Sequence, residues 1–367
     1  MIIDTNKEAL LAALQKVAGV VEKRQTLPIL ANVMVTVEKG KLSFIGTDME
    51  IEIQTSFEVS ADQDGSVTLP ARKLLEIARS IENESDVHIE VAQDKAVFTS
   101  GRSRFTLSVL PATEFPIISP TASELTFKTN EAHLKRLLEK TQFAMAHQDV
   151  RYYLNGMLIE IRSDLVRTVA TDGHRLAVAD MDGEITSVDG VQQVILPRKA
   201  VLELNRLLNY TDNEIGIEIT SNHIRFYLDN LVLTSKVIDG RFPDYERVIP
   251  KNSNKQVTID RFKLKQALQR ASILSNEKYR GIRFSFDSQQ LQLQAHNPEQ
   301  EVAEEDMEIN YPFDPLTIGF NVSYMLDVLN NLDSEQVALN LNDENSSALI
   351  HADTDQSARY VVMPMRL

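Results

Sequence analysis

The stretch Val150–Val178, VRYYLNGMLIEIRSDLVRTVATDGHRLAV, shows how the whole chain is organised. Similar sequence occurs once before it, in Pro28–Asp48, and once after it, in Tyr279–Asn297. The second strand of each copy ends in a matching pair, which is Thr47-Asp48, Thr171-Asp172 or His296-Asn297. These pairs lie about 125 positions apart, a period that indicates three copies of a domain and not a solenoid of short repeats. Only the middle copy continues as Asp-Gly-His-Arg-Leu, so we expect a specific site there.

The composition is that of a globular protein large enough for two or three domains. The chain has 367 residues, of which 43% are hydrophobic, so each domain can bury a core. It holds no run of 18 apolar residues, and the acids near its N-terminus are atypical of a signal peptide, so we expect no membrane partner. The absence of cysteine excludes disulfides and thiolate metal sites, and it fits a cytoplasmic protein.

Hydrophobic periodicity predicts two helices and several strands in each copy. In the first copy, Leu10, Leu14, Val17 and Val21 recur at helical spacing, whereas apolar residues alternate through 51–59 as in a half-buried strand. We therefore predict an α+β fold of three similar domains, each with antiparallel sheets and two helices on their inner face. The expected domains are 1–124, 125–252 and 253–367. The expected helices are 7–21, 71–82, 131–145, 198–208, 261–275 and 322–333.

The charge is divided between the helices and the rest of the chain. The formal net charge is −15, yet the six expected helices with their immediate flanks hold 17 basic and 9 acidic residues. A basic helical surface on an acidic protein suits contact with phosphates on one face. The alternative is that Lys and Arg stand there as good helix formers on solvated faces.

Signals for catalysis are weak, and we expect neither an enzyme nor a cofactor. No P-loop, GxGxxG or HExxH pattern is present, and the seven histidines show no metal-ligand spacing. His174 beside Asp172 could form half of an acid–base pair, but a structural role in a turn at Gly173 is the stronger interpretation. The acids of 299–306 are expected to form a solvated loop and not a cation site.

The C-terminus, Tyr360–Leu367, stays apolar to the last residue, where tails are normally polar. Such a tail is either buried as a strand or forms part of a binding groove, and the sequence favours neither. Its two methionines suit an adaptable apolar surface.

Five motifs together resemble one known family, the bacterial DNA sliding clamps, which are beta subunits of DNA polymerase III. The resemblance covers essentially the whole chain and is least distinctive in the N-terminal third. The motifs are Gln148–Met157, Thr171–Leu176, Asp239–Tyr245, Leu274–Lys278 and Val361–Leu367.

The resemblance implies a head-to-tail homodimeric ring with helices lining a central hole for double-stranded DNA, which is bound without sequence specificity. It also implies that the clamp loader, the replicative polymerase and other polymerases or repair proteins dock through short peptides, and that the clamp has no enzymatic activity. Helix packing agrees with the dimer. Six helices about 10 Å apart leave a hole of roughly 9 Å, whereas twelve leave roughly 28 Å, enough for a duplex about 20 Å wide.

The resemblance also implies roles for individual residues. The positions that match DNA contacts are Arg24, Arg72, Gln148, Tyr152 and Tyr153. Those that match one wall of the peptide groove are Leu154, Thr171, Gly173, His174, Arg175, Leu176, Pro243 and Val248. Those that match the other wall are Asn321, Tyr324, Ser347, Val361, Val362, Met363, Pro364, Met365, Arg366 and Leu367. Those that match the subunit interface are Phe105, Leu107, Ile273 and Leu274, for which ordinary core burial is the alternative.

Two other classes of protein fit the sequence less well. A sequence-specific DNA-binding protein would need a recognition helix, and no helix-turn-helix signature is present. A hydrolase would use Asp172 and His174. One departure from a uniformly basic set of helices is 322–333, which has no Lys or Arg, so the third domain is expected to contact DNA only through its first helix.

Overall fold

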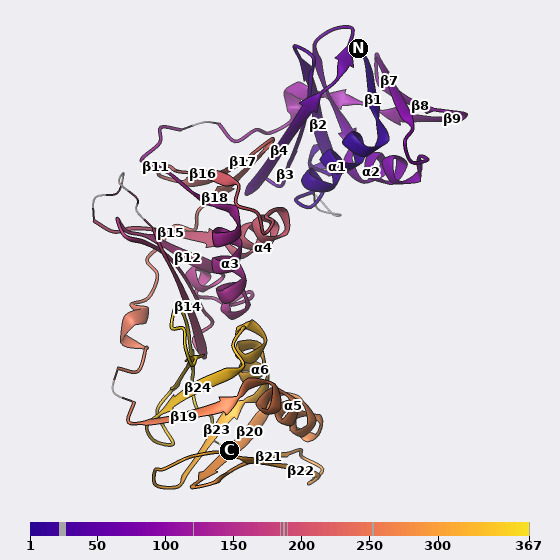
Figure 1. Ribbon diagram of the computed structural model, residues 1–367. Coiled ribbons are helices and arrows are strands. Elements are labelled where there is room, and N and C mark those ends of the chain that lie inside the picture. The colour runs from indigo at the N-terminus through magenta and orange to yellow at the C-terminus, as the bar shows by residue number, and fades with distance from the viewer. Residues whose placement is uncertain are drawn as a thin grey trace. The chain divides into compact units, whose positions relative to one another are not determined.

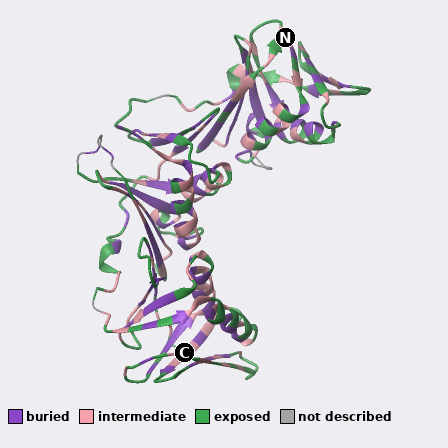
Figure 2. Cartoon of the chain, viewed as in Figure 1, coloured by how far each residue is buried: buried purple, intermediate pink, exposed green. Residues whose placement is uncertain are grey.

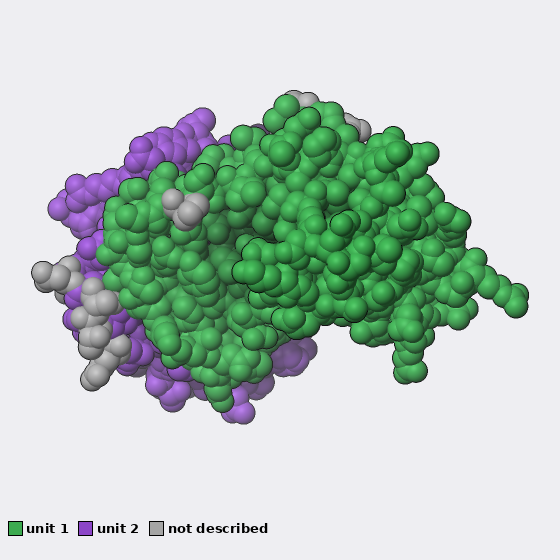
Figure 3. Space-filling view, turned by 90° about the horizontal axis from the view of Figure 1, so that it is seen from above, with its two compact units in different colours: residues 1–132, 202–237 green, residues 133–201, 238–367 purple. Residues whose placement is uncertain are grey.

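The computed structural model describes residues 1–21, 27–119, 121–183, 185, 188, 190–251 and 253–366. These form two compact units, drawn in two colours in Figure 3. Unit 1 comprises Met1–Ala132 and Leu202–Val237, and unit 2 comprises His133–Val201 and Ile238–Leu367. In the described part of the chain, no helix has the length and apolarity needed to cross a membrane.

All six expected helices are present (Figure 1). They are α1 (Lys7–Val17), α2 (Ala71–Ser80), α3 (Glu131–Thr141), α4 (Arg198–Leu207), α5 (Arg261–Ala271) and α6 (Val322–Asn331). The first helix of each copy ends earlier than we predicted: α1 ends at Val17, and α3 and α5 tighten into 3-10 turns at Gln142–Ala144 and Ser272–Leu274. The further 3-10 turns are Pro28–Ala31, Ala112–Glu114, Tyr152–Leu154 and Tyr245–Arg247.

The strands form four antiparallel sheets. The five-stranded sheet has the order β5 (Ser60–Ala61), β1 (Ile2–Asn6), β7 (Asp86–Ala92), β8 (Lys95–Ser100) and β9 (Ser103–Ser108). The nine-stranded sheet has the order β10 (Leu110–Pro111), β6 (Gly65–Pro70), β2 (Asn32–Glu38), β3 (Lys41–Thr47), β4 (Ile51–Glu58), β18 (Leu231–Lys236), β17 (His223–Leu228), β16 (Glu214–Ile219) and β11 (Leu125–Asn130). The eight-stranded sheet has the order β15 (Gln192–Pro197), β12 (Gly156–Ile161), β13 (Leu165–Thr171), β14 (Arg175–Asp182), β26 (Ala358–Val362), β25 (Ala348–Ala352), β24 (Gln336–Leu341) and β19 (Lys255–Asp260). The four-stranded sheet has the order β22 (Val302–Glu308), β21 (Gln290–His296), β20 (Gly281–Asp287) and β23 (Leu316–Asn321).

The order of elements confirms the threefold repeat. Leaving aside the two-residue strands β5 and β10, each copy runs strand, helix, four strands, helix, three strands. The copies begin at β1, β11 and β19. The pairs that defined the repeat in the sequence stand at equivalent places, since β3, β13 and β21 end at Thr47, Thr171 and His296.

The helices bury the faces that their periodicity predicts. Leu10, Leu14 and Val17 of α1 are buried, as are Leu264 and Leu268 of α5. Burying each of these side chains contributes roughly 1.5–3 kcal/mol. Figure 2 shows buried residues along the strands and exposed residues on the outer helix faces.

Side-chain caps determine where several helices begin. The Asn6 carboxamide oxygen accepts a hydrogen bond from the Ala9 amide at the start of α1 (2.9 Å). The Asp260 carboxylate does the same for the Lys263 amide of α5 (2.9 Å). Each cap satisfies an amide that would otherwise lack a partner within the helix.

Strands from different copies pair with one another, a feature that the sequence did not reveal. In the nine-stranded sheet β4 of the first copy pairs with β18 of the second, with Thr55 opposite Leu231. In the eight-stranded sheet β14 of the second copy pairs with β26 of the third, with Arg175 opposite Val362. The sheets therefore continue from one copy to the next within each unit.

The expectation of a solvated acidic loop at 299–306 is wrong in its second half. Residues Val302–Glu308 form the edge strand β22, in which exposed and half-buried residues alternate. Alternating small or apolar residues, such as Ala303 and Met307, give the segment a strand period despite its acids. Charged residues on an edge strand also discourage unspecific pairing.

A substitution in β3 should show how closely helix and sheet pack. A Cβ atom at Gly46 would lie 2.7 Å from the backbone oxygen of Val17 in α1. Gly46→Ala should lower the free energy of unfolding by about 1–3 kcal/mol in urea denaturation. The control is Gly183→Ala, where an added Cβ meets nothing within 4 Å, and its effect should stay within about 0.5 kcal/mol. Equal stability of the two variants would contradict this packing.

Candidate functional site

The Asp-Gly-His-Arg sequence of the middle copy forms a tight turn between β13 and β14. The Asp172 carboxylate accepts hydrogen bonds from the amides of His174 (2.9 Å) and Arg175 (3.0 Å). The Thr171 hydroxyl accepts one from the Gly173 amide (3.1 Å). Asp172 is thus occupied by the backbone and His174 is exposed, which favours the structural interpretation over an acid–base pair.

Gly173 is required at this turn for two reasons. Its φ of +87° is a conformation that other residues adopt with strain. A Cβ atom there would also lie 2.8 Å from a guanidinium nitrogen of Arg151. Arg151 is held by Asp149 (Nη2 to Oδ2, 2.8 Å), whose pKa is lowered to about 2 by this hydrogen bond and by a second one from the Arg151 amide.

Arg175 connects the turn with α6 of the third copy. Its guanidinium donates to Asp172 (3.2 Å), to Asp327 and to the backbone oxygen of Phe143 (2.8 Å). It also lies over the ring of Tyr324, 4.4 Å from the centroid. Arg175 and Tyr324, which we assigned to opposite walls of a groove, are therefore in contact.

An apolar cluster lies directly beneath these residues. It brings together Leu154, Leu176 and Val361, three of the predicted groove residues, from segments far apart in the sequence. All three are buried, whereas Val248 and Met363 are 44% and 41% exposed. The arrangement is a buried apolar floor with exposed apolar side chains at its rim, which is suited to holding an extended peptide.

The C-terminal tail begins as a buried strand, one of the two possibilities that the sequence left open. Residues Ala358–Val362 form β26, whose Val361 and Val362 are buried between β14 and β25. Beyond it the Met363 amide donates to the His174 oxygen (3.0 Å), and Met365 reaches β23 through its amide. The tail is thus a buried strand followed by a surface segment.

The remaining groove candidates lie around this floor. Asn321 caps α6 by accepting a hydrogen bond from the Ser323 amide (2.9 Å). Pro243, Gly173 and Arg366 are exposed, and Thr171, Ser347, Pro364 and Met365 are half-buried. Leu367 lies outside the described residues.

The candidate DNA contacts are dispersed over both units. Gln148 and Tyr152 are exposed, and the Tyr152 ring meets that of Tyr153 edge-on at 5.7 Å. Tyr153 also packs against the apolar cluster, so these tyrosines lie next to the predicted groove residues. Arg72 is exposed on α2 in unit 1, and Arg24 lies outside the described residues.

The candidate interface residues differ in exposure. Ile273 is 77% exposed and Leu274 is half-buried, which ordinary core residues would not be. Phe105 is half-buried and Leu107 is buried, both on the edge strand β9. Core burial therefore accounts for Leu107 and not for Ile273.

Two aromatic residues of the motif Asp239–Tyr245, to which no role was assigned from the sequence, cover the cluster from the side of Pro243. Phe242 and Tyr245 are buried in the cluster. The Tyr245 hydroxyl donates to Glu160 (3.2 Å) and accepts from Arg167 (3.1 Å). Burial of the Tyr245 phenol raises its pKa. The signal in the sequence was the motif itself, whose Phe-Pro-Asp-Tyr places two aromatic residues three positions apart.

Arg167 and Glu160 form a buried ionic network around that hydroxyl. Arg167 pairs with Asp180 (2.5 and 2.9 Å), and its hydrogen bonds to that carboxylate raise the pKa of the guanidinium. Glu160 is almost fully buried and is satisfied by Arg162 (2.6 Å) and Gln193 (2.7 Å). Buried charges with this many partners position neighbouring segments strongly.

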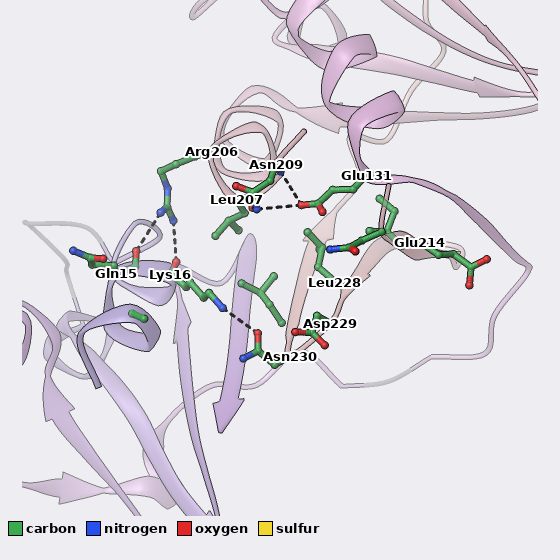
Figure 4. Close-up of a pocket in the computed structure, with 14 residues that line it drawn as sticks. Gln15, Lys16, Glu131, Arg206, Leu207, Asn209, Glu214, Leu228, Asp229 and Asn230 are labelled. Carbon is green, nitrogen blue, oxygen red and sulfur yellow. Dashed lines mark hydrogen bonds between the residues drawn. The ribbon is translucent and has the colours of Figure 1, made fainter. Parts of the chain in front are cut away.

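A polar hollow of about 820 Å³ lies in unit 1 (Figure 4). Arg206 reaches across it to the backbone oxygens of Gln15 (3.1 Å) and Lys16 (2.8 Å) at the end of α1. Lys16 in turn donates to Asn230 (3.0 Å), and Glu131 accepts from the Asn209 amide (2.7 Å). These groups satisfy one another and join the first and second copies, so the hollow has a structural role.

Nothing in the described residues has the make-up of a metal site, since no three His, Asp or Glu side chains gather as ligands would. The site consists of an apolar floor, a cationic link and a polar rim. Such a surface is suited to binding.

Comparison with known proteins identifies the fold along the whole chain. Family profiles for the N-terminal, central and C-terminal domains of the DNA polymerase III beta subunit match residues 1–119, 128–244 and 246–366. The beta sliding clamp of Pseudomonas aeruginosa is 52% identical, and that of Escherichia coli strain K12 is 49% identical, each over 98% of both chains. The crystal structure of the DNA polymerase III subunit beta from Pseudomonas aeruginosa matches with a TM-score of 0.97 at 50% identity over 100% of both chains.

These similarities define the class as a sliding clamp, a non-catalytic processivity factor of DNA replication, and not a sequence-specific DNA-binding protein. The chain belongs to the DNA polymerase III beta subunit family. Proteins of this family bind DNA and polymerase partners. The family match agrees with the resemblance that the five sequence motifs carried.

The network beneath the groove can be tested by removing one hydroxyl group. Tyr245→Phe should lower the free energy of unfolding by about 1–2 kcal/mol, because Glu160 and Arg167 each lose a buried partner. Tyr227→Phe is the matched control, since Tyr227 also donates to a glutamate, Glu218, but is 41% exposed. Urea denaturation should show a change within about 0.5 kcal/mol for the control. If Tyr227→Phe lowers the free energy of unfolding as much as Tyr245→Phe does, the buried network does not contribute to stability.

Proposed function

We propose that the chain acts as a head-to-tail homodimeric ring that encircles double-stranded DNA in the cytoplasm. The ring holds DNA without recognising its sequence. The clamp loader, the replicative polymerase and other polymerases or repair proteins dock through short peptides. Each subunit contributes three domains, at 1–124, 125–252 and 253–367.

The pairing of equivalent strands in the three copies supports the ring. Strand β4 pairs with β18, and the equivalent β14 pairs with β26. The third such pair would be β22 with β9, and each of these is the terminal strand of its sheet in the described chain. Since a subunit has one strand of each kind at an edge, pairing with a second subunit on both sides closes a ring of two.

Charge and exposure support the pairing of β22 with β9. Strand β22 carries Glu304, Glu305 and Asp306, whereas β9 and the turn before it carry Arg102 and Arg104. Opposite charges on facing edges favour the correct partner. Ile273, next to β22 through the 3-10 turn Ser272–Leu274, would lose its exposed apolar surface in the dimer, with Leu274, Phe105 and Leu107.

DNA contact is proposed for Arg24, Arg72, Gln148, Tyr152 and Tyr153. The exposure of Arg72, Gln148 and Tyr152 supports this role. Cationic and hydrogen-bonding groups that meet phosphates carry no sequence information, as a sliding protein requires.

Peptide docking is proposed for the groove above Leu154, Leu176 and Val361, with Met363 as a movable lid at its rim. Burying two large apolar side chains contributes roughly 1.5–3 kcal/mol each. After the cost of ordering a flexible peptide, the affinity should be about micromolar. Weak docking suits partners that must exchange on one ring.

Topological binding gives the first test. Once loaded on nicked circular DNA, the protein should stay bound at a salt concentration that abolishes direct binding. It should dissociate when the circle is linearised, by sliding off the end. The control is the double variant Ile273→Ala, Leu274→Ala, which should be monomeric by light scattering and should not be retained. Equal retention of the native protein on circular and linear DNA would argue for ordinary groove binding instead.

Removal of the tail gives the second test. Deleting Met363–Leu367 removes the lid and part of one wall while β26 and the proposed interface stay intact. Binding of a polymerase-derived peptide should fall at least tenfold in fluorescence anisotropy, a loss of about 1.4 kcal/mol or more. The truncated protein should remain a dimer. Unchanged peptide affinity would place the groove elsewhere.

A further inference from the structure

A polar hollow of about 580 Å³ lies at the start of the third copy. It is lined by Asn254 and Lys255, where β19 begins, by Ser288 in the turn between β20 and β21, and by residues 311–314 between β22 and β23. None of these residues belongs to the groove, the DNA contacts or the subunit interface proposed above. The hollow is therefore a separate surface of the third copy.

Tyr311 is the unusual residue of this lining. It is fully buried, and its ring lies 5.3 Å from those of Phe286 and Phe313, measured between centroids. Its hydroxyl has no hydrogen-bond partner among the described residues. Leaving a buried hydroxyl unsatisfied costs free energy, so this group calls for a partner from outside the chain.

The second copy shows that packing alone does not require the Tyr311 hydroxyl. The Tyr311 amide donates to the oxygen of Ser288 (3.1 Å), and the Ile185 amide donates to the oxygen of Ser163 (2.9 Å). Ser288 lies in the turn between β20 and β21, and Ser163 lies in the equivalent turn between β12 and β13. Tyr311 and Ile185 thus occupy equivalent positions, and both are buried. The third copy carries a polar group where the second copy has a hydrocarbon side chain.

The charged groups at the hollow define what it can bind. The Lys255 ammonium donates to the backbone oxygen of Asn342 (2.9 Å), which uses one of its three N–H groups. Burial of the phenol and the nearby Asp314 carboxylate raise the pKa of Tyr311, so its hydroxyl stays protonated at neutral pH and can donate. Two donors, one of them charged, suit a carboxylate. Asp314 suits an N–H donor beside that carboxylate.

We propose that this hollow binds an α-carboxylate together with the nitrogen on the same carbon atom. The Tyr311 hydroxyl and the Lys255 ammonium donate to the carboxylate, and Asp314 accepts from the N–H group. The half-buried ring of Phe313 and the exposed Pro312 provide apolar surface for the side chain of the ligand.

A phosphate dianion fits this hollow less well, because it would face Asp314 with no donor of its own. The proposed group occurs both in a free amino acid and in the C-terminal residue of a peptide. The choice of probes distinguishes these two sources.

The test measures the binding of three probes to the full-length protein by saturation-transfer NMR. N-acetyl-leucine represents a peptide C-terminus, leucine represents a free amino acid, and leucinamide lacks the carboxylate. N-acetyl-leucine should bind with a Kd of about 1 mM, and leucinamide should bind at least tenfold more weakly. Binding of leucine as well would extend the site to free amino acids, and binding of leucine alone would restrict it to them.

Two variants of the hollow assign the binding to this site. Tyr311→Phe removes one oxygen atom and should weaken binding of the carboxylate probe at least fivefold. Lys255→Gln should also weaken it, because the charge is lost while an N–H donor to Asn342 remains. The matched control is Tyr360→Phe, since Tyr360 is fully buried with an unpartnered hydroxyl but does not line the hollow. Its affinity should be unchanged.

The stability of the variant gives an independent test. Without ligand, the urea midpoint of Tyr311→Phe should equal or exceed that of the native protein, because the lost hydroxyl has no partner within the chain. A lower midpoint would show that the hydroxyl is already satisfied inside the fold, and it would overturn the site.

Three binding results would also overturn the proposal. They are the absence of binding by either carboxylate probe, equal binding of leucinamide, and affinity that Tyr311→Phe and Lys255→Gln leave unchanged. Deleting Met363–Leu367 separates this site from the groove, since carboxylate binding should survive the deletion. Loss of binding in that variant would place the probe in the groove instead.

Discussion

The pairing of strands from different copies is the interaction on which the rest of this structure depends. Strands β4 and β14 would be open edges in isolated domains, and exposed edges invite unspecific pairing. Their hydrogen bonds to β18 and β26 satisfy those edges and carry each sheet through two copies. The same geometry leaves β9 and β22 at the ends of their sheets. A single structural rule therefore accounts both for the continuity within the chain and for the edges through which a second chain would join.

Polar contacts give the apolar floor a defined position. Arg175 links β14 to α6 through Asp327, and the Tyr245 hydroxyl fixes the covering segment against Glu160 and Arg167. Apolar contacts alone are weakly directional, so a floor built only from leucine and valine would tolerate small shifts. The proposed binding surface would depend on such directional links, because its residues come from two copies and the tail.

The turn after the second strand differs among the three copies. Met49, Gly173 and Pro298 occupy equivalent positions after β3, β13 and β21. Met49 takes a φ of +77° at that turn, and Gly173 takes +87° with Arg151 packed against it. Because the scaffold beneath the turn is shared, these positions can differ while the core is maintained.

Local features of this protein were determined by the sequence alone. The spacing of Leu10 and Leu14 predicts the buried helix face, and the Thr-Asp pair predicts the turn, because both depend on neighbours within a few residues. Only the tertiary structure decided which strands pair between copies, since backbone hydrogen bonding is available to every edge. It also decided that the tail is a buried strand followed by a surface segment, and that Arg175 meets Asp327, 152 residues away. Those contacts arise from the packing of whole domains, which no local pattern encodes.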